Sequence, residues 1–351
     1  MKMTFRWFGD TDKVSLNYIK QIPCMSGVVS AIYSVPVGEV WSEDEILALK
    51  NKCKDAGLEF EVVESVPVHE DIKLGKGRYK EYIENYKANI RLLSKHGVKC
   101  ICYNFMPVFD WTRSELDHPL NDGSNALVYY QEQLNNIDIK NMSLPGWDAS
   151  YTPEQMIHLI DEYKSMGEEG LWKNLEYFIH EIMPVAVECD VNMAIHPDDP
   201  PWSIFGLPRI ITNEYNLDRF LSLYDDPHHG LTLCSGSLGC TKSNDIPKLI
   251  AKYTKMNRIH FAHIRNVKIL DNNDFEESAH YSACGSLDMV DIMKAYYENG
   301  FNGYIRPDHG RMIWGETGKP GYGLYDRALG AMYLSGIWET LVKGNKTNDT
   351  F

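Results

Sequence analysis

Eight short apolar runs alternate with helical segments along this chain, and this alternation constrains its fold more than any other feature. The runs read as buried strands and lie at residues 4–8, 27–32, 59–64, 98–104, 191–196, 231–234, 258–264 and 303–306. Helical patterns lie at 42–56, 78–96, 167–189, 217–223, 244–253, 287–299 and 325–342. Strands that alternate with helices pair in parallel through right-handed crossovers. Eight of them predict an α/β fold of the (β/α)8 TIM-barrel type.

One connection is much longer than the others. Residues 106–166 follow the fourth strand, show little helical periodicity before Pro153 and are rich in aromatic, Asn and Asp residues. A connection of this length is usually a lid, a binding loop or an oligomer contact. We therefore expect one catalytic barrel domain over 1–344 that carries this insertion, a polar tail at 345–351, and assembly into a homodimer or a larger homo-oligomer.

The acidic balance of the chain argues against two classes of partner. Its 351 residues carry a net charge of −14, whereas nucleic acids and anionic membranes favour a basic face. No stretch of 18 apolar residues and no apolar signal segment at the N-terminus are visible. The eight cysteines are scattered without a CxxC pair, which is typical of a reducing compartment. We expect a cytoplasmic enzyme that acts on a small molecule.

Four apolar runs in the second half of the chain end in residues that bind metal ions. The segments AIHPDDPP, LTLCSGSLG, HFAHIRN and IRPDHGR contain His196, Cys234, His263 and Asp308. Their separations of 38, 29 and 45 residues exclude a local zinc finger and match one strand plus one returning helix. Imidazole, thiolate and carboxylate ligands together hold a divalent transition ion. The pattern predicts a metal site at the barrel mouth, where active sites of this fold lie.

Alternation along the strands supports this prediction. Ala194 shares the face of His196, and Thr232 shares the face of Cys234, while the apolar residues between them face the helices. The face on which the His263 side chain lies is less clear, because apolar residues occupy the same alternate positions of its strand. A single buried histidine is more often only hydrogen-bonded, and a single buried cysteine usually acts as a small apolar residue. Four such residues in matched positions favour the metal site.

Five further residues near these strand ends are candidates for catalysis and substrate binding. His309 can transfer a proton at neutral pH or serve only as a hydrogen-bond partner. Arg306 can bind a substrate carboxylate through two hydrogen bonds or pair with a carboxylate of the barrel. Asp198 and Asp199, followed by two prolines, can bind substrate hydroxyls, support the metal ligands, or form only a rigid turn. Tyr322 lies in the turn KPGYG, whose glycines let the backbone bend sharply and expose the phenol. This turn alone is weak evidence for a catalytic tyrosine.

Longer motifs resemble a known family. The segments FRWFG, SGVVSAI, GEVW, VVESVPVHEDIK, CYNFMPVFDWTR, AIHPDDPP, GLPRI, HFAHIRN and RPDHGR followed by KPGYG are similar to D-mannonate dehydratases over residues 5–339. The resemblance is to the metal-dependent, xylose-isomerase-like barrels rather than to the enolase type. It implies Mn²⁺ or Fe²⁺ held by His196, Cys234, His263 and Asp308, with proton transfer by His309 and Tyr322.

The resemblance also implies a reaction, the loss of water from D-mannonate to give 2-keto-3-deoxy-D-gluconate in hexuronate (glucuronate) catabolism. Tyr322, as a phenolate near the metal, is expected to be the base, His309 the acid, and Arg306 the residue that orients the carboxylate. The assignment of acid and base between the two stays open. Two alternatives also stay open, a metal-dependent aldose–ketose isomerase that acts on neutral sugars and a non-catalytic sugar-acid sensor.

Overall fold

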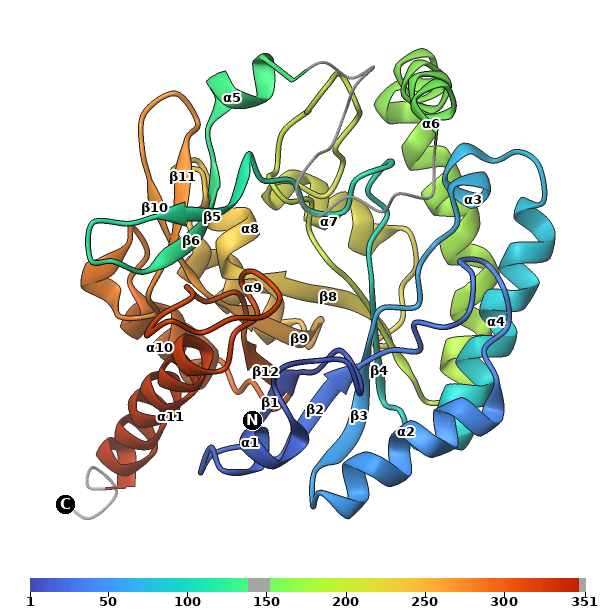
Figure 1. Cartoon of the computed structure of the whole chain (residues 1–351). Coiled ribbons are helices and arrows are strands. Elements are labelled where there is room, and N and C mark those ends of the chain that lie inside the picture. The colour runs from blue at the N-terminus through green and yellow to red at the C-terminus, as the bar shows by residue number, and fades with distance from the viewer. Residues whose placement is uncertain (138–151, 347–351) are drawn as a thin grey trace.

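Eight parallel strands close into a barrel at the centre of the molecule (Figure 1). The computed structural model describes residues 1–137 and 152–346. Around the barrel the strands are β1 (Lys2–Arg6), β2 (Gly27–Ser30), β3 (Glu59–Glu64), β4 (Cys100–Tyr103), β7 (Asn192–Ile195), β8 (His229–Cys234), β9 (Ile259–Ile264) and β12 (Tyr304–Pro307). The last strand pairs in parallel with the first. These are the eight predicted strands, so the predicted (β/α)8 fold is confirmed.

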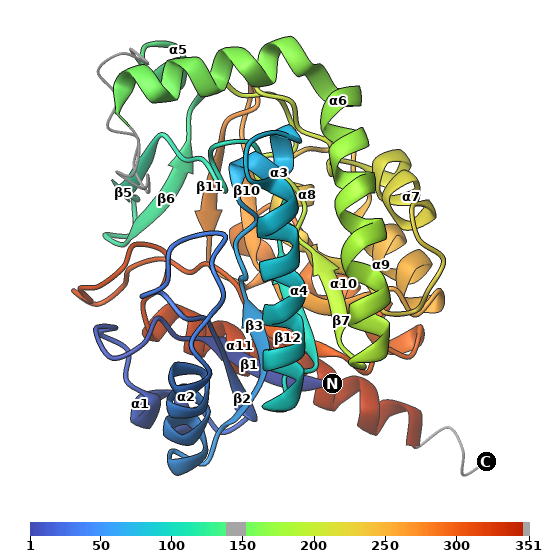
Figure 2. The ribbon, with the colours of Figure 1, turned by 90° about the vertical axis from the view of Figure 1, so that its right-hand side faces the viewer.

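Helices cover the outside of the barrel and return the chain from one strand to the next (Figures 1 and 2). The longer ones are α2 (Glu43–Asp55), α4 (Tyr79–Lys95), α6 (Pro153–Glu188), α7 (Glu214–Ser222), α9 (Ile246–Lys255), α10 (Met289–Glu298) and α11 (Tyr325–Lys346). Four short elements, α1 (Leu16–Lys20), α3 (Glu70–Leu74), α5 (Gln131–Asn135) and α8 (Ser235–Gly239), lie in the connections. Within the described residues, no helix combines the length and apolar character needed to cross a bilayer.

Helix α6 begins earlier than the sequence pattern predicted. It starts at Pro153, where Thr152 and Gln155 form a reciprocal capping box. Gly167, the predicted start, is instead a kink with a φ of 66°, a conformation that glycine adopts without steric cost. Figure 2 shows the two arms of the helix, one across the top of the view and one beside α4. The C-terminal helix likewise continues to Lys346, and the rest of the predicted tail lies outside the described residues.

A second sheet, which the sequence analysis did not predict, begins at the carboxyl end of the barrel. Its antiparallel strands are β5 (Glu115–Pro119), β6 (Asn125–Tyr129), β10 (Asn266–Ile269) and β11 (Phe275–Ser278), in the order β10-β11-β6-β5. One hairpin comes from the long connection after β4, and the other follows β9 after the single residue Arg265. The predicted insertion 106–166 is therefore part strand and part helix α6, and its residues 138–151 lie outside the described residues.

The inside of the barrel is filled by a small apolar core that is separate from the larger one under the helices. Its members are Val29, Val62, Cys100, Cys102, Ala194 and Phe261. Thr232 also faces inward, since its hydroxyl lies 3.2 Å from the sulfur of Cys102, a member of this inner core. The expected inward faces of β7 and β8 are thus correct. Because this core closes the barrel interior, polar residues at the strand ends face the mouth.

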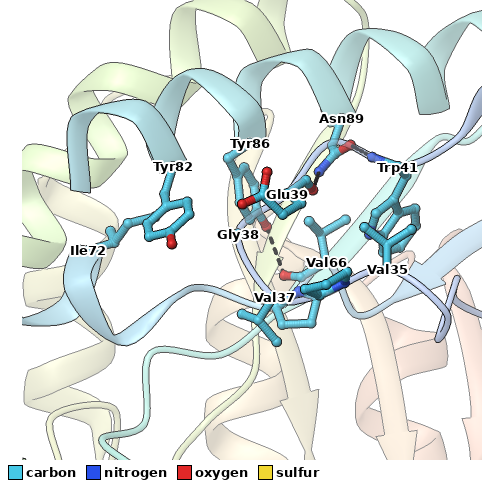
Figure 3. A pocket seen from close by; sticks show the side chains of 12 residues that line it. Val35, Val37, Gly38, Glu39, Trp41, Val66, Ile72, Tyr82, Tyr86 and Asn89 are labelled. Atoms are coloured by element: carbon cyan, nitrogen blue, oxygen red, sulfur yellow. Dashed lines mark hydrogen bonds between the residues drawn. The ribbon is translucent and has the colours of Figure 1, made fainter. Parts of the chain in front are cut away.

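The connection after β2 packs tightly against α4 (Figure 3). The Trp41 amide donates to Asn89 Oδ1 at 2.8 Å, Asn89 Nδ2 donates to the Glu39 carbonyl at 3.2 Å, and the Tyr86 hydroxyl donates to the Val66 carbonyl at 3.3 Å. The space left between these residues is about 10 Å³, room for no more than one water. This packing anchors the segments after β2 and β3, which also border the pocket at the barrel mouth.

Candidate metal centre and active site

Three of the four predicted metal ligands converge at the ends of β7, β8 and β9. One ligand atom each from His196, Cys234 and His263 lies within 4.8 Å of the other two. The two imidazole rings have their centroids 4.9 Å apart. Metal–ligand bonds of about 2.0–2.3 Å place neighbouring ligand atoms about 3–4 Å from each other. A small adjustment of these side chains would therefore close them around one ion.

Asp308, the fourth predicted ligand, lies beside this group and is held by two arginines. Its Oδ1 is 3.9 Å from His263 Nδ1, and Cys234 Sγ donates to its Oδ2 at 3.4 Å. Arg306 Nη2 and Arg265 Nε each lie 2.8 Å from one of its oxygens. Burial opposes ionisation, but Arg306 and the cations around it hold the pKa of Asp308 well below its usual range. The carboxylate is therefore anionic, as a metal ligand must be.

One imidazole nitrogen of this group, His263 Nε2, is buried and makes no hydrogen bond among the described residues. Buried polar atoms are nearly always paired, so this nitrogen indicates a missing partner. The sulfur of Cys234 also accepts from the Ser237 amide at 3.4 Å and from its hydroxyl at 3.0 Å, so two donors fix its position. The donor set of nitrogen, sulfur and oxygen fits a divalent transition ion.

Glu64 and Cys102 form a second group with His263, which sequence analysis missed. Burial raises the pKa of the Cys102 thiol well above its usual value, so the thiolate needed for metal binding is disfavoured there. Glu64 is anionic, because Arg306 and His263 outweigh burial and hold its pKa well below the usual range. Its Oε2 lies 3.4 Å from His263 Nε2. Glu64 is thus a neighbour of the predicted centre rather than part of a separate one.

His309 lies between two partners at the same mouth. Its Nδ1 is 2.7 Å from Glu277 Oε1, and its Nε2 is 2.9 Å from the Tyr322 hydroxyl. Burial raises the pKa of Tyr322 above its usual value, while Arg306 acts in the opposite direction. The phenol is therefore protonated and able to donate to Nε2, and the two side chains can exchange a proton directly. Glu277 was not among the predicted site residues.

A buried network of alternating charges connects this pair to the second sheet. Arg113 makes a two-bond contact with Asp199 at 2.9 and 3.1 Å and donates to Glu277 at 2.7 Å. Arg265 donates to the same two carboxylates, each at 2.7 Å. All four side chains are buried from solvent. Buried charges persist only when paired in this way, so the network sets the geometry around it.

The two neighbouring aspartates predicted to bind substrate point in different directions. Asp199 borders the pocket, although the arginine network already engages its carboxylate. Asp198 accepts the backbone amides of Ile210 and Ile211 at 2.6 and 2.9 Å and holds that loop. It is not among the residues that border the pocket. The predicted contact between Asp198 and the substrate stays a prediction, and the position of this side chain away from the pocket does not favour it.

A pocket of about 260 Å³ opens at the mouth of the barrel. Six of the predicted site residues border it, namely His196, Asp199, Arg306, Asp308, His309 and Tyr322. Cys234 and His263 lie beneath, fully buried. A pocket of this kind, with metal-ligand residues below and a proton-transfer pair on its wall, can bind a small polyhydroxylated molecule.

Two cations that the sequence analysis did not single out stand at the rim of this pocket, Arg6 and Lys319. The Arg6 guanidinium lies 3.9 Å from Glu64 Oε2. Lys319 Nζ lies 3.8 Å from the centroid of the Phe8 ring, and no carboxylate within the described residues pairs with it. The side chain of Lys319 reaches solvent, but its ammonium is partly desolvated over the Phe8 ring. This desolvation, together with the nearby charge of Arg6, lowers the pKa of Lys319 to about 8. These charges favour an anionic ligand.

Comparison with known proteins places the chain in a family. The family model described as D-mannonate dehydratase (UxuA) matches residues 1–348. The chain is 59% identical over 343 residues to mannonate dehydratase 2 of Halalkalibacterium halodurans, which covers 97% of this chain and 99% of that protein. It is 53% identical over 352 residues to a mannonate dehydratase of Oceanobacillus iheyensis, across 100% of this chain and 99% of the relative.

A solved structure gives the same result. The mannonate dehydratase of Streptococcus suis serotype 2 superposes with a TM-score of 0.92 at 49% sequence identity, and the match covers 98% of this chain and 96% of that one. The match extends over the barrel and the connections that build the pocket, so it reaches well beyond the general barrel fold. The chain belongs to the D-mannonate dehydratase family.

Proposed function

We propose that this chain is a D-mannonate dehydratase, a carbon–oxygen lyase that removes water from D-mannonate to give 2-keto-3-deoxy-D-gluconate. Family membership supports the substrate and the reaction. The observation that carries the proposal is the convergence of the metal-ligand group and the His309–Tyr322 pair on one pocket. The elimination needs charge stabilisation beside a carboxylate and a proton donor for the leaving hydroxyl, and both lie there.

The metal is proposed to be Mn²⁺ or Fe²⁺, held by His196, Cys234, His263 and Asp308. When bound, the ion would act as a Lewis acid for the negative charge that develops next to the substrate carboxylate. The buried His263 Nε2, which makes no hydrogen bond among the described residues, and the mixed donor set support this assignment. The same donor set tolerates other first-row metals, so metal content and activity are to be measured together.

Proton transfer is proposed for Tyr322 and His309. The step starts from Tyr322 as a phenolate and His309 as an imidazolium, after the phenol proton has passed to His309 Nε2. Tyr322 then takes the C2 proton, and His309 gives a proton to the C3 hydroxyl, which leaves as water. The electron pair of the C2–H bond forms the C2–C3 double bond, and the resulting enol becomes the ketone. The hydrogen bond of 2.9 Å between the two side chains then lets a proton return from Tyr322 to His309. The reverse assignment uses the same contact and is the alternative.

Arg306 is proposed to orient the substrate carboxylate. One of its nitrogens, Nη2, donates to Glu64 at 3.1 Å, while Nε and Nη1 are buried and make no hydrogen bond to the residues that the structure describes. Asp199 is proposed to reach the substrate hydroxyls from the pocket wall. The rim cations Arg6 and Lys319 favour a sugar acid over the neutral sugar that an aldose–ketose isomerase would take. The intact His309–Tyr322 pair argues against a sugar-acid sensor without catalysis.

The remaining assignments are proposals about context. We place the enzyme in the cytoplasm and in hexuronate catabolism, as one barrel domain over 1–344 that forms a homodimer or larger homo-oligomer. All eight cysteines lie within the described residues and none forms a disulfide, in keeping with a reducing compartment. The segment 106–166 is proposed to close the pocket or to form the subunit contact. Sedimentation that showed a strict monomer would remove the second role.

The first experiment is an activity assay on chelator-treated protein. D-Mannonate is supplied with and without Mn²⁺, and 2-keto-3-deoxy-D-gluconate is measured. Product that depends on the metal is the expected result. A folded protein that gives no product with any divalent metal, but converts a neutral aldose, would replace the dehydratase by the isomerase.

A further inference from the structure

We propose that Glu277 positions His309 for proton transfer, which makes the second sheet a working part of the active site. This inference rests on the proposed dehydratase function and adds a residue that lies outside every motif used to recognise the site. Glu277 does not reach the pocket itself. It is therefore a positioning residue that acts through His309.

The strand β11 presents its two adjacent glutamates to opposite environments. Glu276 accepts from the Tyr130 hydroxyl at 2.9 Å and lies 3.7 Å from Lys268, in a partly exposed position. Glu277 is only 1% exposed and faces the barrel mouth, where its Oε1 meets His309 Nδ1 at 2.7 Å. Alternation along a strand explains this difference, since successive side chains leave on opposite faces.

Two arginines hold the Glu277 carboxylate in place. Arg113 Nη2 and Arg265 Nη1 each donate to Oε1 at 2.7 Å, and both guanidinium groups are fully buried. Burial opposes ionisation, but Arg265, followed by His309 and Arg113, lowers the pKa of Glu277 to about 2. An ionised carboxylate can only accept hydrogen bonds. His309 must therefore present Nδ1–H to Glu277.

This contact decides which ring nitrogen serves the pocket. With its proton on Nδ1, neutral His309 has a free electron pair on Nε2, which points at the Tyr322 hydroxyl at 2.9 Å. The opposite tautomer would leave Nδ1 and the carboxylate facing each other as two acceptors. A carboxylate that orients a histidine in this way fixes the tautomer and the ring plane together.

The same network couples His309 to the candidate metal ligand that precedes it. Arg265 lies 2.8 Å from Asp308 through Nε and 2.7 Å from Glu277 through Nη1. Asp308 and His309 are neighbours in the chain. Arg306 of β12 and Arg265 of the β9–β10 junction hold Asp308, and Glu277 of β11 holds His309. Arg265 therefore links the group that positions His309 to the candidate metal ligand beside it.

The test compares three variants at saturating Mn²⁺ with D-mannonate as substrate. Glu277→Asp keeps the negative charge near the arginines but withdraws the carboxylate by about 1.5 Å from His309. Glu277→Gln keeps the length and removes the charge. Glu276→Gln is the matched control on the same strand. We expect Glu277→Asp to lower kcat about 10- to 100-fold with KM and metal content nearly unchanged, and Glu276→Gln to behave as the unaltered enzyme.

A spectroscopic measurement on the unaltered chain makes the test independent of whether the variants fold. Protein loaded with Zn²⁺ and labelled with ¹⁵N-histidine should show His309 protonated on Nδ1, with its signals assigned through His309→Asn. The opposite tautomer would overturn the inference. So would a Glu277→Asp enzyme with normal kcat, or one whose loss lies entirely in metal binding. If the unaltered enzyme makes no product from D-mannonate, the dehydratase proposal fails, and the tautomer still decides the role of Glu277.

Discussion

The barrel strands β7, β8, β9 and β12 and the second sheet both serve the same pocket, but they do so by different means. Each barrel strand brings one candidate metal ligand, and the ligand position follows from the regular end of a buried strand. The second sheet brings Glu277, and the segment just before β5 brings Arg113; their side chains hold His309 and Asp199. The residues that can bind the metal are thus placed by local sequence patterns at the strand ends. The residues that hold their neighbours in position come from segments that are distant in the sequence.

The largest expected effect comes from removing a candidate metal ligand of the barrel strands. Cys234→Ser should lose the metal and lower activity by at least about 10³-fold, because a hydroxyl is a much weaker ligand than a thiolate for a transition ion. Metal content per chain and product formation measure both effects. Cys189→Ser, which removes a thiol at the end of α6, is the control and should keep both. Full metal content in Cys234→Ser would contradict the proposed ligand set.

The next effect concerns the proton-transfer pair, which joins the two regions. Tyr322→Phe and His309→Asn should each lower kcat about 10²- to 10⁴-fold while the metal stays bound, since each removes a proton carrier. Single-turnover kinetics with D-mannonate measure the loss. Tyr130→Phe, which removes a hydroxyl that donates to Glu276 of the second sheet, should keep normal turnover. Near-normal kcat in both Tyr322→Phe and His309→Asn would show that other groups move the protons.

The second sheet should matter more for stability than for metal binding. Arg113→Met removes one of the two arginines between Asp199 and Glu277 and should lower the free energy of unfolding by about 3–5 kcal/mol, because it leaves buried carboxylates undercompensated. Denaturant unfolding measures this change. Arg78→Ala, which breaks an exposed pair with Glu81, should change stability very little. Equal effects of the two substitutions would contradict the role given to the buried network.

The smallest effect is a pH dependence at the rim. Because the pKa of Lys319 is lowered to about 8, its ammonium is charged at neutral pH and loses its proton above that value. The KM for D-mannonate should therefore rise, by up to about 10-fold, as the pH passes upward through 8. Lys319→Met should already show the high KM at pH 7, and Lys319→Arg should keep the low KM at high pH. A KM of Lys319→Met that matches the unaltered enzyme would exclude this role.

The sign of the stability effect at Lys319 is the opposite of its effect on binding. Its folded pKa lies below the ordinary value of a lysine, so the fold disfavours the charged form. Stability should therefore rise as the pH increases from about 8 toward the ordinary lysine pKa. Lys319→Met should leave thermal stability at neutral pH unchanged or slightly higher, which separates a binding role from a structural one.

Sequence patterns predicted the barrel and the convergence at its mouth because those signals are local. An apolar run of four to six residues indicates its own strand, and alternation indicates which residues face inward, as Thr232 does. Strand ends of a parallel barrel meet at one mouth whatever the loops contain, which explains why the spacing of His196, Cys234 and His263 was informative. The capping signal at Thr152 and Gln155 was equally local and could have placed the start of α6.

The second sheet could not be predicted in the same way. Its strands ELDHP and FEES are short and polar, so neither shows a strand period. The strand FEES is held by pairing with the distant β6, where Phe275 lies opposite Tyr129, and ELDHP joins the sheet only through the same β6. Asp198 and Asp199 illustrate the same limit, because two identical neighbours serve a backbone loop and an arginine network respectively. No local pattern distinguishes them.

The sequence by itself therefore determined the alternating strands and helices, the (β/α)8 closure, the family resemblance and the residue types available at the strand ends. These follow from hydrophobic periodicity and from motifs that are read within a few residues. Only the tertiary structure decided that Glu277 meets His309, that Asp198 turns away from the pocket and that Arg6 and Lys319 stand at its rim. Such contacts depend on where distant segments are brought together, and burial then sets the charge state of each group they contain.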